Sequence, residues 1–150
     1  MNSRAGLNLA EVREPRFEES EQELFFPSGL LGFAGCRHYK LHRFKPGDGS
    51  DSPFFTLNAT DQDLIFPLIH PASIALDYRF PITPELLTGL GATSAQELVP
   101  LLIVTVREPI ENITVNLKGP IIINTTKGLG LQLVIEQYDL HYPLLPLKSR

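Results

Sequence analysis

The sequence contains one cysteine, Cys36, and no tryptophan. A single cysteine cannot form an internal disulfide and excludes a zinc site built from several cysteines. No run of about 18 apolar residues occurs, so we expect no transmembrane helix. The N-terminus also lacks the apolar core of a secretory signal. These absences favour a soluble protein of the reducing cytoplasm that has no contact with a membrane.

The chain has no excess of positive charge. Its 150 residues include 17 acidic and 13 basic residues, giving a net charge of -4. Domains that bind nucleic acid through bulk charge are usually basic, so we expect no direct nucleic-acid binding. The composition, 43% hydrophobic and 20% charged, is typical of one globular domain.

The acidity is concentrated near the N-terminus. Residues 11–23 hold six glutamates against two arginines, whereas the remainder is nearly neutral. One interpretation is a solvated tail or an edge strand kept apart from its neighbours by like charge. The other is an acidic docking surface for a basic protein. The candidates for the second role are Glu18, Glu19, Glu21 and Glu23.

Short alternating and apolar runs predict an all-β fold, mostly antiparallel. We expect a flexible segment at residues 1–15 and one domain at residues 16–150. About nine short strands joined by tight turns are typical of a small β-barrel or a sandwich-like barrel. The clearest runs are 22–26, 38–44, 54–59, 64–69, 101–107, 112–118, 121–124 and 131–136. Pro67 predicts an edge strand or a bulge, because proline cannot donate to a ladder.

Helical signals are confined to the middle of the chain. Thr83-Pro84-Glu85 fits a capped helix start, and Ser94 with Glu97 fits a capping box. We therefore expect one or two short helices around residues 84–99. Further on, the segment 127–130 contains two glycines and predicts a hairpin turn with positive φ available at both.

Alternation predicts which side chains form the core. In the segment 112–118, Ile113, Val115 and Leu117 share one face, opposite Asn112, Thr114 and Asn116. The remaining expected core positions are residues 101–106, residues 121–123, Leu131, Leu133 and Ile135.

The sequence offers no catalytic, cofactor or metal motif. His38 and His42 would lie roughly 13 Å apart on a strand, too far to share a zinc ion. Cys36 has no marked base beside it and fits a buried small residue. Asp61 and Asp63 lack the rest of a calcium loop and fit ordinary turn chemistry.

Five segments resemble a known family: GLLGF, PFFTLNATDQDLIFPLIHP, LDY, TVNLKGPIIIN and LQLVIEQY. Between about Phe25 and Leu144 the chain resembles the bacterial flagellar assembly factor FliW. The run from Thr114 to Asn124, followed by Gln132 and Tyr138, is the most specific part. The family usually carries alanine where this chain has Gly119.

The resemblance implies a compact, mostly antiparallel β-barrel that is not an enzyme. It implies cytoplasmic binding to flagellin and to CsrA, a small RNA-binding translational repressor, with the two competing. Flagellin supply would thereby control flagellin translation. We expect a monomer or a weak homo-oligomer. Two alternatives stay open: a barrel that binds a small ligand or catalyses a reaction, and a structural subunit that forms a homo-oligomer.

Partner binding is expected at exposed loops near these segments. The candidates are Asp61, Asp63, Asp77, Tyr78, Asn116 and Asn124. Tyr78 is the expected anchor, because tyrosine is enriched among binding hot spots. For Asn116 and Asn124 two roles remain open: bonding to backbone at strand ends or a bulge, or contact with the partner.

Overall fold

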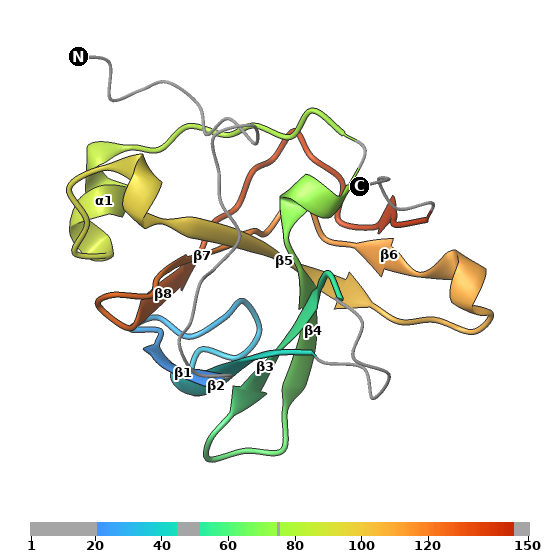
Figure 1. Cartoon of the computed structure of the whole chain (residues 1–150), viewed down its shortest axis with the longest axis horizontal. Helices are drawn as coiled ribbons and strands as arrows, with labels where there is room; N and C mark the ends of the chain where they lie inside the picture. Colours follow the sequence, from blue (N-terminus) through green and yellow to red (C-terminus); the bar gives the residue numbers. More distant parts are fainter. Residues whose placement is uncertain (1–20, 45–51, 75, 146–150) are drawn as a thin grey trace.

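The computed structural model describes residues 21–44, 52–74 and 76–145 (Figure 1). The predicted flexible segment 1–15, together with Glu18 and Glu19, lies outside these residues. The strands are β1 (Glu21–Phe25), β2 (His38–Arg43), β3 (Phe54–Ala59), β4 (Ile65–Ile69), β5 (Val99–Thr105), β6 (Thr114–Val115), β7 (Ile121–Asn124), β8 (Leu129–Gln132) and β9 (Tyr142–Pro143). The helical elements are η2 (Pro71–Ser73), α1 (Pro84–Gly89), η3 (Ala95–Glu97) and η4 (Ile110–Asn112).

Seven strands close into a barrel in the order β4-β3-β2-β1-β8-β7-β5, with β5 pairing back to β4. The pairing of β1 with β8 is parallel and rests on Phe25 opposite Leu129. The other pairings are antiparallel. The prediction of a mostly antiparallel small barrel is therefore confirmed. Strands β6 and β9 extend the sheet beyond β5 as an arm, visible in Figure 1.

Apolar side chains fill the inside of the barrel. Alternate residues of the strands point inward, as the pleat requires. The cluster includes Leu24, Phe26, Leu30, Cys36, Tyr39, Leu41, Phe55, Leu57, Leu68, Leu101, Ile121 and Ile123. Cys36 is buried, as expected for a small core residue.

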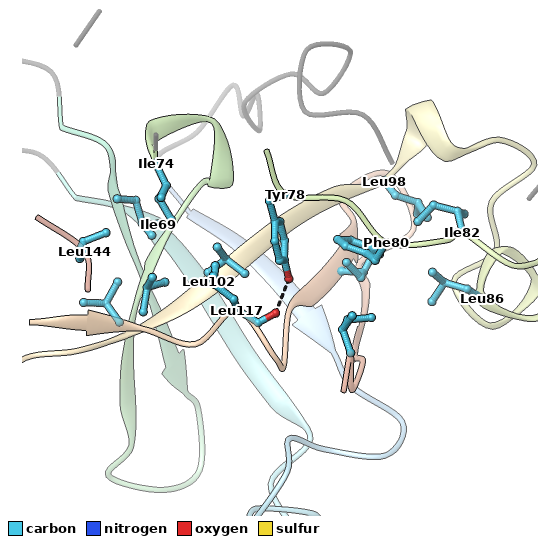
Figure 2. Packing of buried hydrophobic residues seen from close by; sticks show 14 of the residues in the cluster. Ile69, Ile74, Tyr78, Phe80, Ile82, Leu86, Leu98, Leu102, Leu117 and Leu144 are labelled. Carbon is cyan, nitrogen blue, oxygen red and sulfur yellow. Dashed lines mark hydrogen bonds between the residues drawn. The ribbon is translucent and has the colours of Figure 1, made fainter. Parts of the chain in front are cut away.

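A second apolar core lies outside the barrel wall, where β5, β7 and the end of β4 are buried on both faces. Leu101 packs in the barrel interior, whereas its neighbour Leu102 packs in the outer core. The same division separates Ile121 from Ile122. Figure 2 shows residues of the segment 74–98 lying over this wall. Burial on both faces explains why these strands read as continuous apolar runs.

The chain between β4 and β5 carries the expected helical turns. Thr83 caps α1 by accepting a hydrogen bond from the Leu86 amide at 3.1 Å. The Glu97 carboxylate accepts from the Ser94 amide and from the Thr93 hydroxyl at 2.6 Å. These hydrogen bonds, above all those from Thr93, lower the pKa of Glu97.

Three expectations need correction. Val106 was expected in the core but is 61% exposed, because β5 ends at Thr105. The last run was expected to continue as a strand to residue 136, but β8 ends at Gln132. Gly128 has a positive φ of 69°, whereas Gly130 lies within β8 against the Phe26 ring. At Gly130 the absent side chain matters, rather than conformational freedom.

Candidate partner-binding surface

In the segment 114–124, β6 and β7 both pair with β5 and are separated by a bulge. Val115 pairs with Val104 and Ile121 pairs with Leu101. The segment therefore has three more residues between these two pairs than β5 has. The Asn116 side chain holds the bulge, because its Oδ1 accepts from the amides of Lys118 and Gly119, each at 2.9 Å. The expectation that Asn116 bonds to backbone at a bulge is confirmed.

Gln132 ties this bulge to a loop far away in the sequence. Its Nε2 donates to the Gly119 carbonyl oxygen at 2.9 Å, and its Oε1 accepts from the Leu31 amide at 2.8 Å. A Cβ at Gly119 would lie 2.8 Å from that Nε2 atom, so glycine permits the close approach. Leu31 is 59% exposed at the surface beside this contact.

Tyr78 is not an exposed anchor, and that prediction about its position is wrong. Its side chain is buried, and its hydroxyl donates to the Leu117 carbonyl oxygen at 2.6 Å (Figure 2). Its ring packs against Tyr138 with centroids 4.7 Å apart. Burial, and secondarily Tyr138, raises the pKa of Tyr78. Tyr78 therefore fixes the bulge from the core side.

Asn124 is also an internal residue. It is buried at the end of β7, where its Nδ2 donates to the Leu90 carbonyl oxygen at 2.8 Å. Its Oδ1 accepts from the Lys127 amide at 3.3 Å in the hairpin before β8. The expected bonding to backbone is confirmed here too, and the side chain joins the end of α1 to this hairpin.

Asp61 and Asp63 lie exposed in the turn between β3 and β4. The Cys36 thiol lies 3.8 Å from Asp61 Oδ1, at hydrogen-bonding distance for sulfur. Burial of the Tyr39 hydroxyl, with smaller contributions from Cys36 and Asp61, raises the pKa of Tyr39. This end of the barrel thus combines a buried thiol and phenol with surface carboxylates.

The remaining predicted residues lie on different parts of the surface. Asp77 is exposed and accepts from Arg79 Nε at 3.0 Å. Glu21 and Glu23 are exposed on β1, and Glu21 lies 3.4 Å from Lys40 Nζ. The structure therefore does not gather the predicted residues into one cluster. It instead joins Asn116, Tyr78 and Gln132 around the bulge.

Sequence reasoning missed the role of Gln132 and several exposed apolar side chains. Gln132 occurs within a quoted family segment, but its partner Leu31 is 101 residues away. Among the described residues, the large apolar side chains exposed by more than 45% are Leu31, Phe44, Ile65, Val106, Ile110, Val134 and Leu140. Phe44, Ile65 and Val106 lie at or next to strand ends, where burial is least.

Neither a metal cluster nor a membrane-spanning helix occurs in the described ranges. No group of three or more His, Cys, Asp or Glu side chains there could hold a metal ion. No helix in them has the length and apolar character needed to cross a membrane.

The described structure is a small, mostly antiparallel β-barrel. Its barrel interior is filled by apolar side chains, and its distinctive polar residues bind backbone. A family model described as "FliW protein" matches residues 10–144. The chain therefore belongs to the FliW family, whose members are non-enzymatic assembly factors.

Proteins named flagellar assembly factor FliW are similar over most of their length. The protein of Natranaerobius thermophilus is 36% identical over 134 residues, covering 85% of this chain and 86% of that protein. That of Clostridioides difficile is 31% identical over 120 residues, covering 78% and 89%. A crystal structure of the flagellar assembly factor FliW superposes with a TM-score of 0.72 at 27% identity, covering 91% and 93%.

Proposed function

We propose that this chain is a cytoplasmic flagellar assembly factor that binds flagellin and the RNA-binding repressor CsrA. The two partners compete for it, so that free flagellin releases the repressor and accumulated repressor limits further flagellin synthesis. The observation that carries the proposal is the family match over residues 10–144. The names of the curated relatives point to the same process.

The charge of the chain supports a basic partner such as the repressor. An RNA-binding protein presents positive charge to phosphates. The glutamates at residues 18–23 would attract such a surface and repel RNA at the same time. Within the described residues, Glu21 and Glu23 are exposed on β1, in agreement with this role.

The alternative of a ligand-binding or catalytic barrel receives no support from the interior. Apart from the Cys36 thiol and the Tyr39 hydroxyl, the inward-facing positions hold buried leucine, isoleucine and phenylalanine side chains. The alternative of a homo-oligomeric subunit is tested by light scattering of the purified chain across a concentration series. The mass of a monomer at every concentration is the result expected for a protein that binds its partners as a single chain.

The test of the proposal is direct binding between purified proteins. The full chain is titrated with flagellin and, separately, with CsrA by isothermal calorimetry. Saturable binding to both is expected. Absence of binding to both, with the chain folded by circular dichroism, overturns the proposal. An unrelated secreted protein and an unrelated small basic protein serve as controls for nonspecific association.

A further inference from the structure

The side chains of Asn116 and Gln132 meet at Gly119, in the bulge between β6 and β7. A Cβ on Gly119 would lie 3.0 Å from Asn116 Nδ2 and 2.8 Å from Gln132 Nε2, so both amide groups lie against this glycine. Gln132 uses both of its polar atoms, on Leu31 N and on Gly119 O. Asn116 uses Oδ1, which accepts from two backbone amides. Within the part of the chain that the structure describes, its Nδ2 donates to no acceptor.

Val134 extends this surface along the chain. The antiparallel pairing of β7 with β8 continues past Gln132 through two backbone hydrogen bonds, at 2.9 and 2.7 Å, to Pro120 O and Lys118 O. The residues on either side of Val134 donate these bonds, so Val134 lies opposite Gly119, which has no side chain to cover it. Because side chains alternate along an extended chain, Val134 points to the same side as Gln132. It is 47% exposed.

Leu31 lies at the corner of a tight turn that is held in place. The Phe33 amide donates to Leu30 O at 2.7 Å, and Gly32 has a positive φ of 85°, which glycine adopts without strain. The Leu31 amide is fixed to Gln132 Oε1, and the Leu30 side chain is buried inside the barrel. A side chain on a fixed turn loses little conformational freedom when a partner covers it. The turn therefore offers a preorganised apolar contact beside Gln132.

These residues form one uncharged surface, which we call the bulge face: Leu31, Asn116, Gln132 and Val134. The charges beside it balance, because Lys118 Nζ lies 3.3 Å from Glu136 Oε1. Neither an acidic nor a basic partner gains from such a surface, so its complement is an uncharged apolar segment. The Asn116 Nδ2 group also requires an acceptor, which any peptide carbonyl supplies.

We propose that an uncharged, apolar segment of a partner protein binds across the bulge face. Its apolar side chains pack against Leu31 and Val134, and one of its peptide carbonyl oxygens accepts from Asn116 Nδ2. Asn116 thus serves both purposes, with Oδ1 holding the bulge and Nδ2 holding the partner. Lys118 and Glu136 form part of the polar rim. The inference rests on the proposed function only in that a protein is the partner.

Truncation of the two apolar side chains tests the proposal on the full chain. Leu31→Ala combined with Val134→Ala should weaken the binding of purified flagellin or CsrA by about tenfold or more, as hot-spot truncations do. The matched control is Ile110→Ala combined with Val106→Ala, which removes equally many carbon atoms from exposed side chains between β5 and β6. It should leave both affinities unchanged. Isothermal calorimetry measures the affinities, and thermal melting shows that both variants fold as the parent does.

Asn116→Asp tests the donor separately from the bulge. It keeps an oxygen for the Lys118 and Gly119 amides but replaces Nδ2 by a charged acceptor. Partner binding should fall by about tenfold while the melting temperature stays near that of the parent. Asn112→Asp, at an exposed position before β6, adds the same charge and should leave binding unchanged. Binding of Asn116→Asp equal to that of the parent would overturn the role of the donor.

The outcomes separate this surface from the proposed function. If flagellin or CsrA binds the parent, and the Leu31 and Val134 double variant binds equally well, the inference is wrong and the function stands. Equal weakening by the control double variant also overturns the inference, since the loss is then not specific to the bulge face.

If the parent binds neither protein, the function fails and a peptide decides the inference. The probe is a capped pentapeptide of threonine, leucine, asparagine, leucine and threonine, titrated to about 5 mM into the isotope-labelled chain. Nuclear magnetic resonance should show saturable shifts of the Leu31 and Val134 methyl groups and of the Asn116 side-chain amide. No shifts, or shifts only elsewhere, overturn the inference.

Discussion

The hydroxyl of Tyr78 donates a 2.6 Å hydrogen bond to the carbonyl oxygen of Leu117, 39 residues further along the chain. Leu117 is a buried residue of the bulge between β6 and β7, and its amide in turn donates to Asp139 O at 3.0 Å. The bond therefore fastens the bulge to the segment that covers the outer core. This explains why Tyr78 points inward, although its neighbours Asp77 and Arg79 are exposed.

Tyr78→Phe should destabilise the fold without altering partner association. It leaves the Leu117 carbonyl buried without its donor, which costs about 1–3 kcal/mol. A chain of this size should then melt roughly 2–10 °C lower. Tyr142→Phe is the control, because that side chain is only half-buried. Unchanged melting of Tyr78→Phe together with faster partner dissociation would instead restore Tyr78 as a contact residue.

Tyr39 and Tyr78 should resist ionisation at alkaline pH for as long as the chain stays folded. Burial raises the pKa of both Tyr39 and Tyr78, so the folded state favours their neutral form. The resulting stabilisation is complete below the unfolded pKa of about 10 and declines as pH rises above it. Tyrosinate absorbance should show Tyr39 and Tyr78 ionising only as circular dichroism reports unfolding. Ionisation of Tyr39 or Tyr78 near pH 10 in a folded chain would contradict this.

Gly130→Ala should be strongly destabilising. A Cβ there would overlap the ring of Phe26, which is fully buried inside the barrel. Overpacking of this kind costs about 1–3 kcal/mol. Gly35→Ala is the matched control, since a Cβ at Gly35 meets no atom within 4 Å and the residue has no positive φ. Chemical denaturation measures both, and equal stability of the two variants would refute the packing argument.

Asn116→Ala should loosen the bulge, whereas Asn116→Asp should largely preserve it. The hydrogen bonds from the Lys118 and Gly119 amides go to Oδ1, which aspartate retains. Loss of both acceptor contacts should lower the stability by about 1–2 kcal/mol. Thermal melting tests the difference. Equal melting of both variants and the parent, with lost partner binding in Asn116→Ala, would show that Asn116 contacts the partner directly.

The acidic segment should steer a basic partner rather than anchor it. Changing Glu18, Glu19, Glu21 and Glu23 together to glutamine should slow association with CsrA by about tenfold at low salt. It should also flatten the salt dependence of the association rate. Stopped-flow kinetics at two salt concentrations measure both. Changing Glu85, Glu108, Glu111 and Glu136 together to glutamine removes the same number of charges elsewhere and controls for net charge. If the fourfold variant associates with CsrA as fast as the parent does at low salt, the acidic segment is only a solvated edge and does not steer the partner.

Local patterns in the sequence predicted much of the fold because local forces determine it. The alternation at Ile113, Val115 and Leu117 placed three core residues correctly, and the caps of α1 and η3 are contacts within four residues. The polar side chains of Asn116 and Asn124 bond partly to nearby amides, as turn chemistry predicts. The exposure of Tyr78 was misjudged because Leu117 O, its partner, is remote in the sequence.

The surface was less predictable than the core for a related reason. Pro67 was expected in an edge strand or a bulge, but β4 pairs with β3 on one side and, through Leu68 and Ile69, with β5 on the other. The sequence alone did not show that closure of the barrel would bring β5 alongside β4. The link from Gln132 to Leu31 likewise depends on barrel closure, which brings β8 to β1 through one residue pair.

Competition between flagellin and CsrA tests the central claim most directly. Fluorescently labelled CsrA is bound to the full chain, unlabelled flagellin is added, and the fluorescence anisotropy of the repressor is followed. The account predicts that the anisotropy falls to that of free repressor in a saturable, concentration-dependent manner. Anisotropy that stays at the bound value while flagellin is shown to bind the same chain would contradict the account.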